Sequence, residues 1–360
     1  MGLPTTTSQW VLAKKPTEHV VLSGPDATWT LKHDVPLPQL KDGEVLLQTL
    51  YLSNDPAQRT WIFDVDPERL YAPPVNIGDV MRTTRNLCKV LDSKAEKLPT
   101  GSLVNASLGW TQYGVIDAKG LLPLQEIPGL SIVHYLGAFG GVGLTALHGL
   151  TEIGHTTKDD AVVISGAAGG TGSMAVQVAK HLIGCKKVIG IAGGKEKCKW
   201  VESLGADVCV DYKSSAFVED LKKATDGFVE VYFDNVGGSI LDLMLTRLKK
   251  YGRVIACGTI ANYNAAAGKN FGAEKDNRER IGNWFEIISS RLEIKGFILS
   301  DRMDLFPGYI KTLVQAVKDG KLKLGDENNT IVDTKFEEIP KTWTLLFEGA
   351  NKGKLLTKLV

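Results

Sequence analysis

The chain has 360 residues, of which 43% are hydrophobic and 23% are charged, and its 42 basic and 41 acidic side chains nearly cancel. This length allows two domains, each with its own core, and the composition is that of a globular protein. The charge balance argues against nucleic acid or an anionic membrane as a partner. The five cysteines are scattered without C-x-x-C spacing, which argues against a disulfide framework and a four-cysteine zinc site.

The opening segment, MGLPTTTSQWVLAKKP, lacks the apolar core of a signal peptide, and no stretch has the apolar length of a membrane span. The closing TKLV is not a peroxisomal address. By elimination, we expect a cytosolic protein.

The first third of the chain predicts short β-strands. Alternating apolar runs bounded by Gly, Pro and Asp occupy residues 44–53, 101–110 and 111–122. Such runs are typical of an irregular, mostly antiparallel domain.

From about His134 the pattern changes to apolar strands that alternate with segments of helical periodicity. This alternation predicts a parallel, doubly wound sheet of the Rossmann type. Strands are expected at 160–168, 186–194, 207–212, 229–238 and 253–260, and helices at 172–184, 196–206 and 239–252.

The remainder of the chain predicts a long loop and a return to the first domain. Residues 261–283 lack periodicity, and long loops of this kind often border active sites. A further strand is expected at 292–300, an amphipathic helix at 306–322 and a final strand at 354–360. The simplest architecture is α/β, with a nucleotide-binding domain inserted in a β-rich domain built from both chain ends.

A glycine-rich turn joins the strand at 160–168 to the next helix. Read from Ala167 it is A-x-G-x-x-G, with Gly169 and Gly172 in the last two positions. Gly169 would let the backbone approach a pyrophosphate, and Gly172 would let the helix pack on the strand. A simple strand-to-helix turn would look similar, but the complete strand–helix–strand unit around it favours a dinucleotide site.

The second strand of this unit lacks the acidic residue that binds the ribose hydroxyls of NAD. It runs instead into Gly193, Gly194, Lys195 and Lys197. Ammonium groups attract the 2′-phosphate of NADP, and glycines leave it room. The alternative is that the lysines only begin a solvated helix, although the helix dipole favours acidic residues there. We therefore predict NADP(H) as the cofactor.

Several motifs occur together along nearly the whole chain. They are PLPQLKDGEVLLQTLYLSNDPAQR, IGDVMR, GWTQYGVI, HYLGAFGGVGLTALHGL, the glycine loop, GIAGGKEK, YFDNVGG, ACGTIANYN and LFEGANKGK. In this order they resemble the zinc-independent medium-chain reductases of the prostaglandin reductase and alkenal/enone double-bond reductase family.

The resemblance implies a domain plan and an activity. Residues 1–133 and 324–360 would form a GroES-like, partly open barrel, and residues 134–323 a Rossmann NADP-binding domain. The active site would lie between them, without a metal, and the protein would be a homodimer. The activity implied is NADPH-dependent reduction of the C=C bond of α,β-unsaturated aldehydes or ketones, with hydride delivered to the β-carbon.

The resemblance also implies roles for individual residues. Tyr263 matches a tyrosine proposed to assist proton transfer, and Tyr51 matches one that lines the substrate cleft. The residues that match contacts to the cofactor are Lys197, Tyr212, Asn235, Cys257, Gly258 and Asn351.

Reduction of an activated C=C bond needs hydrogen-bond donors at the carbonyl oxygen, where enolate charge develops. Tyr263 could supply one, because a phenol is protonated at neutral pH. The nicotinamide ribose hydroxyl or water could supply the proton instead, with Tyr263 only packing over the cofactor. Tyr51 could likewise be no more than a packed strand residue, and Cys257 reads as a small pocket residue because no base is evident beside it.

Departures from the family pattern fall on positions expected at the substrate side. They are Ala57, Gln58, Leu147 and Ser289. Four rival functions therefore remain: an allylic alcohol dehydrogenase, a quinone reductase, a tailoring enoyl reductase for one metabolite, and a non-catalytic NADPH-binding protein.

Overall fold

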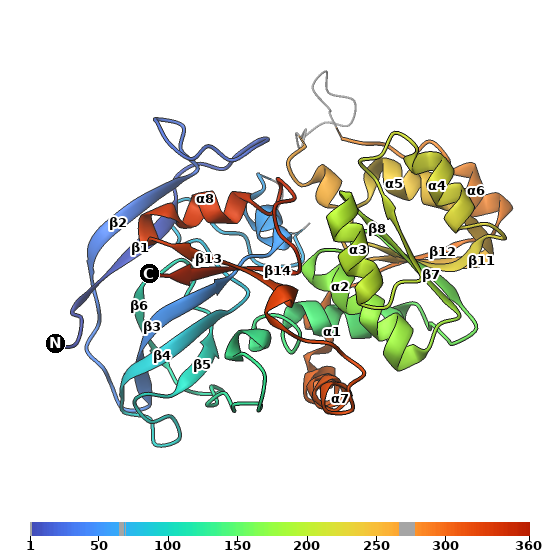
Figure 1. Ribbon diagram of the computed structural model, residues 1–360. Helices are drawn as coiled ribbons and strands as arrows, with labels where there is room; N and C mark the ends of the chain where they lie inside the picture. Colours follow the sequence, from blue (N-terminus) through green and yellow to red (C-terminus); the bar gives the residue numbers. More distant parts are fainter. Residues whose placement is uncertain (1, 65–67, 69, 266–277) are drawn as a thin grey trace.

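The computed structural model describes residues 2–64, 68, 70–265 and 278–360. Two lobes lie side by side, each built on a six-stranded sheet (Figure 1). Both chain termini lie in the β-rich lobe, and the middle of the chain forms the other lobe. The predicted insertion of a nucleotide-binding fold into a β-rich domain is therefore confirmed as a fold class. The boundaries at residues 133/134 and 323/324 stay predictions.

The sheet of the nucleotide-binding lobe is parallel throughout, in the order β12-β11-β10-β7-β8-β9. This is the Rossmann order, and its direction of winding reverses between β7 and β10, where ligands bind in such sheets. The strands are β7 (Ala161–Ile164), β8 (Lys187–Ala192), β9 (Val208–Asp211), β10 (Val229–Asp234), β11 (Leu248–Ala256) and β12 (Glu293–Gly296).

Helices cover both faces of this sheet, as the alternation of buried residues along β7 requires. Val162 and Ile164 join the core beneath α1, α2 and α7, whereas Val163 joins the core on the opposite face. The helices are α1 (Gly141–His148), α2 (Gly170–Gln177), α3 (Lys195–Ser203), α4 (Phe217–Ala224), α5 (Gly238–Leu245), α6 (Phe285–Ser289) and α7 (Phe306–Lys318). The π-helical turns η4 (Gly149–Ile153) and η5 (Val178–Ile183) extend α1 and α2.

Two neighbouring predictions were wrong in their extent. The helix expected over 239–252 ends at Leu245, and the strand expected over 253–260 is β11, which begins at Leu248 and ends at Ala256. Leu248 pairs with Val229 of β10, and the Lys249 ammonium lies 2.5 Å from the Glu230 carboxylate. Pairing with the neighbouring strand overrides the local helical pattern. Of the loop expected over 261–283, residues 266–277 lie outside the described residues.

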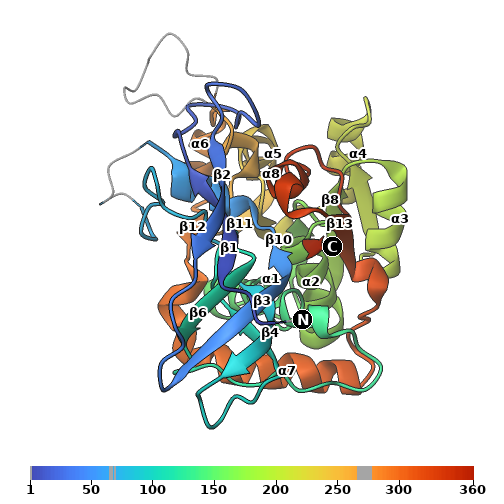
Figure 2. The ribbon, with the colours of Figure 1, turned by 90° about the vertical axis from the view of Figure 1, so that its left-hand side faces the viewer.

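The second lobe joins the two ends of the chain. Its main sheet has the order β13-β14-β3-β4-β5, with β6 also paired to β3, while β1 and β2 form a separate hairpin (Figure 2). The strands are β1 (Thr6–Leu12), β2 (Trp29–Pro36), β3 (Glu44–Ser53), β4 (Asn86–Ser93), β5 (Leu103–Ala106), β6 (Tyr113–Asp117), β13 (Asn329–Thr334) and β14 (Lys354–Leu359).

The core of this lobe is aromatic. The rings of Trp29, Trp110 and Trp343 pack together with centroids 5.0 to 6.2 Å apart. Trp343 comes from α8 (Ile339–Thr344), so the C-terminal segment covers strands from the start of the chain. Such ring pairs stabilise a core beyond the area that they bury.

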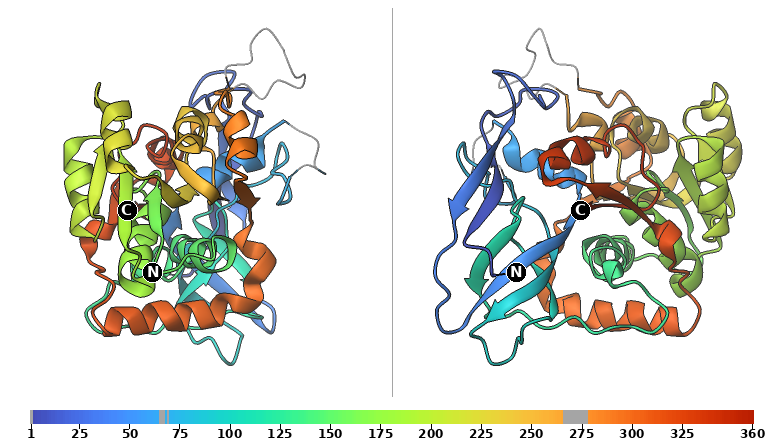
Figure 3. Two further views of the ribbon diagram at one scale, coloured as in Figure 1. Left: turned by 90° about the vertical axis from the view of Figure 1, so that its right-hand side faces the viewer. Right: turned by 60° about the vertical axis from the view of Figure 1, so that its left-hand side comes forward.

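The helix α7 packs against α1 on one face of the Rossmann sheet. Figure 3 shows α7 running along the base of the molecule, beneath α1. Leu313 and Ala316 of α7 are buried in the same core as α1 and α2. In the part of the chain that the structure describes, no helix has the length and apolarity needed to cross a bilayer.

Candidate cofactor and active site

The glycine-rich loop leaves β7 and enters α2 in a conformation that depends on glycine. A Cβ on Gly172 would lie 2.1 Å from the Gly166 carbonyl oxygen, so no other residue fits there without a shift. Ala167 N–H donates to the Ile191 carbonyl at 2.9 Å, which ties the loop to β8. Gly169 precedes the first turn of α2. The predicted residues thus form a loop at a helix N-terminus, the arrangement that binds pyrophosphate.

The C-terminal segment lies directly on this loop. Gly353 N–H donates to the Ala168 carbonyl at 2.8 Å, and Gly353 forms an isolated parallel bridge with Gly169. The Asn351 side chain donates to the Gly353 carbonyl at 2.8 Å. The structure therefore brings Asn351 close to the glycine loop, although it lies 179 positions after Gly172 in the chain.

Lys197 also reaches this segment. Its ammonium donates to the carbonyls of Gly349 at 2.7 Å and Asn351 at 2.6 Å. Partial burial holds the pKa of Lys197 below its ordinary value, and the nearby Lys213 ammonium lowers it further. A bound anion beside Lys197 would favour its charged form and so offset the effects of burial and of Lys213 on its pKa.

The residues that follow β9 and the start of α3 form one surface around Lys197. The Tyr212 ring fills the space that a side chain on Gly193 would need, because a Cβ there would lie 2.8 Å from ring atoms. Asp211 accepts hydrogen bonds from Gly194 N–H at 2.7 Å and Lys213 N–H at 2.9 Å. The bond from Gly194 is the main reason that the pKa of Asp211 lies below its ordinary value.

Sequence reasoning missed two lysines at this surface. Lys213 follows Tyr212 directly, so its position in the chain could have signalled it. Lys352 had no comparable signal; its ammonium lies 5.3 Å from the centroid of the Trp200 ring on α3. Its placement depends on the fold of the C-terminal segment.

The opposite end of the site is organised by Asp234, a residue that sequence reasoning also missed. Its side chain accepts hydrogen bonds from Tyr232 O–H at 2.8 Å, Ser165 O–H at 3.1 Å and two backbone N–H groups after β10. Its main-chain carbonyl accepts the N–H groups of Cys257 and Gly258 at 2.9 and 3.0 Å. Asp234 therefore fixes the turn after β11 against the end of β10.

Asn235 lies beside this group at the point where the winding of the sheet reverses. Its side-chain amide donates to the Ser165 carbonyl at 2.7 Å, and its own N–H donates to Ser165 Oγ at 2.9 Å. The structure thus brings Asn235, Cys257 and Gly258 to one edge of the sheet. Burial raises the pKa of Cys257 to about 12, so it is a neutral thiol at pH 7.

Tyr263 lies over the same turn. A Cβ on Gly258 would lie 3.4 Å from the Tyr263 phenol oxygen, and Thr259 N–H lies 3.5 Å from that oxygen. Burial raises the pKa of Tyr263 to about 12. The phenol therefore stays protonated across the physiological range and is a hydrogen-bond donor.

Arg59 links the segment that carries Tyr263 to the β-rich lobe. It belongs to the 3₁₀ helix η1 (Pro56–Ile62) and is almost completely buried. Its Nε–H donates to Asn264 Oδ1 at 3.2 Å, and its Nη2 donates to the Glu18 carbonyl at 2.5 Å. Burial lowers the pKa of Arg59 to about 10, which leaves it charged at neutral pH.

Tyr51 belongs to the sheet of the β-rich lobe. On β3 it pairs with Leu87 and Lys358, and its side chain packs on the apolar cluster of Leu87, Val133, Leu136 and Leu356. These contacts match the alternative in which Tyr51 is a packed strand residue, and they leave its predicted role at the cleft open.

Two of the residues expected at the substrate side are buried. Gln58 is inaccessible, and its Oε1 accepts hydrogen bonds from Asp55 N–H at 2.7 Å and Trp343 Nε1–H at 3.1 Å. Leu147 is packed in the core of α1. These two departures from the family pattern are therefore explained by packing rather than by exposure at an entrance.

A buried ion pair joins β14 to the start of η1. The Lys354 ammonium contacts the Asp55 carboxylate and donates to the Asn54 carbonyl at 2.7 Å. Burial alone would raise the pKa of Asp55, but Lys354 and the hydroxyls of Thr84 and Ser53 outweigh it and hold the pKa below its ordinary value.

Family models match both halves of the chain. Residues 8–124 match the model described as the N-terminal domain of oxidoreductase, and residues 170–315 match the model described as zinc-binding dehydrogenase. Among the described residues, no group of three or more His, Cys, Asp or Glu side chains is placed to hold a metal ion. Together with the two sheets, these matches define a medium-chain dehydrogenase/reductase.

Comparison with individual relatives identifies the family within this class. Bovine prostaglandin reductase 1 is 34% identical over 97% of this chain and 98% of its own, and the NADPH-dependent curcumin reductase of Escherichia coli is 32% identical over 98% and 96%. The crystal structure of CurA from Vibrio vulnificus in complex with NADPH superposes with a TM-score of 0.84, at 32% identity over 98% and 99% of the two chains. The chain belongs to the prostaglandin reductase and curcumin reductase family.

A further relative, from Saccharomyces cerevisiae, is 36% identical over 98% of each chain and is named an uncharacterized membrane protein.

Proposed function

We propose that this protein is an NADP(H)-dependent reductase of the C=C bond in α,β-unsaturated aldehydes and ketones. The observation that carries the proposal is the half-buried phenol of Tyr263, protonated at neutral pH, which lies over the Cys257–Gly258 turn beside the point where the sheet reverses. Membership of the prostaglandin reductase and curcumin reductase family supports the same reaction class.

The residues of the nucleotide-binding lobe fit NADP(H). Gly169, at the start of α2, leaves the loop backbone without a side chain, as close approach of a pyrophosphate requires, and Gly172 lets the helix pack on the loop. Lys197 and Lys213 supply positive charge, and the Tyr212 ring provides a partly exposed flat surface beside them. Arg and Lys clusters with glycines around them suit a phosphate and disfavour a bare ribose.

NADPH, when bound, supplies the hydride for the substrate β-carbon. Tyr263 then acts at the other end of the conjugated system. Its O–H donates a hydrogen bond to the carbonyl oxygen as negative charge gathers there. Its proton then passes to the enolate, and solvent supplies the proton that restores the phenol. Because burial keeps the phenol neutral, no pH change is needed to prepare this donor. Asp234 holds the turn beneath Tyr263 in place through its backbone bonds to Cys257 and Gly258.

The test is consumption of NADPH at 340 nm by the purified protein with a series of enones and an alkenal, with NADH in parallel. Allylic alcohols with NADP⁺ and quinones with NADPH form two comparison arms. We expect turnover of enones with NADPH and little with NADH. Faster turnover of allylic alcohols or quinones would assign one of those rival activities instead, and tight NADPH binding without any turnover would indicate a dedicated metabolite or a non-catalytic binder.

We also propose that the protein is a homodimer formed through the edge of the Rossmann sheet. In the described residues, β12 pairs on one side only, with β11, and its four residues are exposed. Exposed apolar side chains gather on the elements around it: Trp284, Phe285, Ile288, Ile294 and Met303. An open strand edge beside apolar surface favours association.

Size-exclusion chromatography with light scattering measures the mass of the protein in solution. We expect Ile294→Glu to give a monomer, and Val218→Glu, at an exposed position on α4, to leave the dimer intact. A monomeric wild type would overturn this proposal. The cytosolic location stays a prediction, and cell fractionation would test it, since one relative is named a membrane protein.

A further inference from the structure

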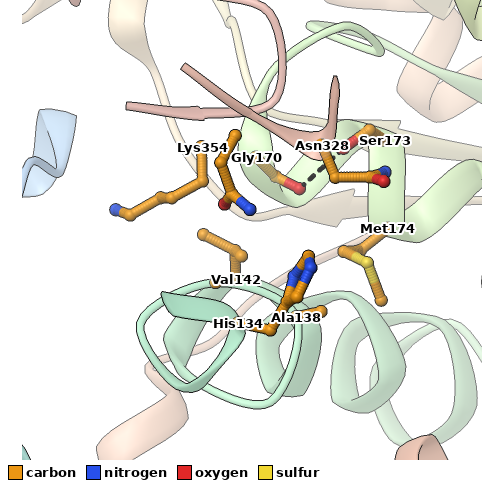
Figure 4. Close-up of a pocket in the computed structure, with 10 residues that line it drawn as sticks. His134, Ala138, Val142, Gly170, Ser173, Met174, Asn328 and Lys354 are labelled. Carbon is orange, nitrogen blue, oxygen red and sulfur yellow. Dashed lines mark hydrogen bonds between the residues drawn. The ribbon is translucent and has the colours of Figure 1, made fainter. Parts of the chain in front are cut away.

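A small cavity lies where three parts of the fold meet. It has a volume of about 10 Å³ and is lined from η3 (Ile132–Tyr135) and α1, from the first turns of α2, and from the segment around Asn328, Asn329 and Lys354 (Figure 4). The segment of η8 (Asp326–Asn328) and β13 belongs to the β-rich lobe, whereas α2 follows the glycine loop. The cavity therefore lies at the junction of the two lobes.

Three nitrogen atoms of its lining side chains have no hydrogen-bond partner among the described residues. They are His134 Nδ1, Asn328 Nδ2 and Asn329 Nδ2, and each is buried. His134 is 2% exposed and Asn328 is 7% exposed. Buried polar atoms of this kind are almost always bonded in native proteins, to protein or to ordered water.

The orientation of Asn328 is fixed by another contact. Its Oδ1 accepts the Gly325 N–H at 2.7 Å, so its Nδ2 group is the one left for the cavity. Figure 4 shows the His134 side chain extending from η3, on the side of the cavity opposite Asn328. The ammonium of Lys354 points away from the cavity. That ammonium is held by Asn54 and Asp55. No unpaired charge therefore faces the cavity from its described lining.

The charge state of His134 decides whether its ring can accept a hydrogen bond. Burial holds the pKa of His134 below its ordinary value, although Asp326 and Glu327 act in the opposite direction. The ring is neutral at pH 7, so one of its two nitrogens is an acceptor. The lining thus offers two amide donors and an imidazole nitrogen that can accept.

We propose that this cavity binds one water molecule, which bridges the two lobes behind the cofactor loop. The water accepts hydrogen bonds from Asn328 Nδ2 and Asn329 Nδ2 and donates one to His134 Nδ1. The space is just large enough for one water, and three polar partners are the usual number for a buried one. Because Gly170 and Ser173 line the same cavity, the water supports the first turn of the helix that follows the glycine loop.

The first test is a crystal structure of the wild-type protein at a resolution that shows ordered waters. We expect one density peak within hydrogen-bonding distance of all three nitrogens. Crystals soaked in bromide distinguish a water from a halide, because only bromide gives an anomalous signal. An anomalous peak, or no density in the cavity, would overturn the proposal.

The second test uses the variants His134→Phe and Asn329→Leu, singly and together, with thermal unfolding and NADPH binding as readouts. Each single variant should lower Tm by about 2–4 °C. The double variant should lose less than the sum, because the first change already releases the shared water. Strict additivity would overturn the bridge. His181→Phe is the matched control, since His181 bonds the Leu204 carbonyl and lines no part of this cavity. Neither test depends on reductase turnover.

Discussion

The ammonium of Lys197 donates to the main-chain carbonyl of Asn351 at 2.6 Å, across 154 residues of sequence. This bond joins the start of α3 to the segment that precedes β14, and the same ammonium also bonds Gly349. A lysine predicted from its position at a helix start is therefore also a connection between the two lobes. Its substitution has consequences for both the cofactor and the C-terminal segment.

We expect Lys197→Ala to weaken NADPH binding about 10- to 100-fold while changing NADH binding much less, since a charge-assisted hydrogen bond contributes about 1.5–3 kcal/mol. Fluorescence titration of both cofactors measures this. Lys199→Ala is the control, because Lys199 is exposed and pairs with Glu196 of the same helix. An unchanged preference for NADPH in Lys197→Ala would show that Lys197 does not bind the 2′-phosphate.

Tyr263→Phe should lower kcat by about 100-fold or more, the usual contribution of a positioned proton donor, with the Kd for NADPH unchanged. Steady-state kinetics with an enone, together with cofactor titration, separate the two effects. Because the pKa of Tyr263 is raised to about 12, loss of its proton should not limit kcat between pH 6 and 9. Full turnover in the variant would assign the proton to the ribose hydroxyl or to water.

Gly172→Ala and Gly141→Ala form a matched pair in neighbouring helices. At Gly172 the new Cβ would lie 2.1 Å from a backbone oxygen, so we expect a shifted loop, a lower Tm and loss of NADPH binding. At Gly141, in α1, nothing lies within 4 Å, and alanine should stabilise the helix by up to about 1 kcal/mol. Calorimetry with and without NADPH measures both. Equal behaviour of the two variants would contradict the close packing of the glycine loop.

The Asp55–Lys354 pair predicts sensitivity to acid. The folded-state pKa of Asp55 is below its unfolded value of 3.8, so its stabilisation is present above that pH and is lost as pH falls through the folded pKa. Removing one partner of a buried pair typically costs about 3–5 kcal/mol. We expect Lys354→Met to be strongly destabilised at pH 7, and Asp55→Asn to lose its stability deficit relative to wild type as the pH falls below about 4. Urea unfolding across pH checks this, and a constant deficit would count against the ion pair.

The sequence predicted most clearly what depends on local pattern. The strand at 44–53 has the predicted bounds, and the glycine loop lies where its spacing places it. Contacts between distant segments were out of reach of such patterns. In the sequence, Asp234 is simply an acidic residue at the end of a strand, and only the structure shows that its carbonyl holds the Cys257–Gly258 turn. Likewise, only the structure shows that Gln58, expected at the substrate side, is bonded by Trp343.

The bridge between Gly353 and Gly169 has a mechanical consequence. The strand β14 begins on the cofactor loop and continues into the other lobe, and the Lys354 ammonium fastens its first residue to Asp55. The lobes cannot separate along this line without breaking main-chain contacts to the loop itself. A second connection, from Arg59 to Asn264, lies on the side of Tyr263. We therefore expect the two lobes to move little relative to each other while both connections are intact, and the junction at Gly353 to be the more rigid because its contacts are main-chain ones.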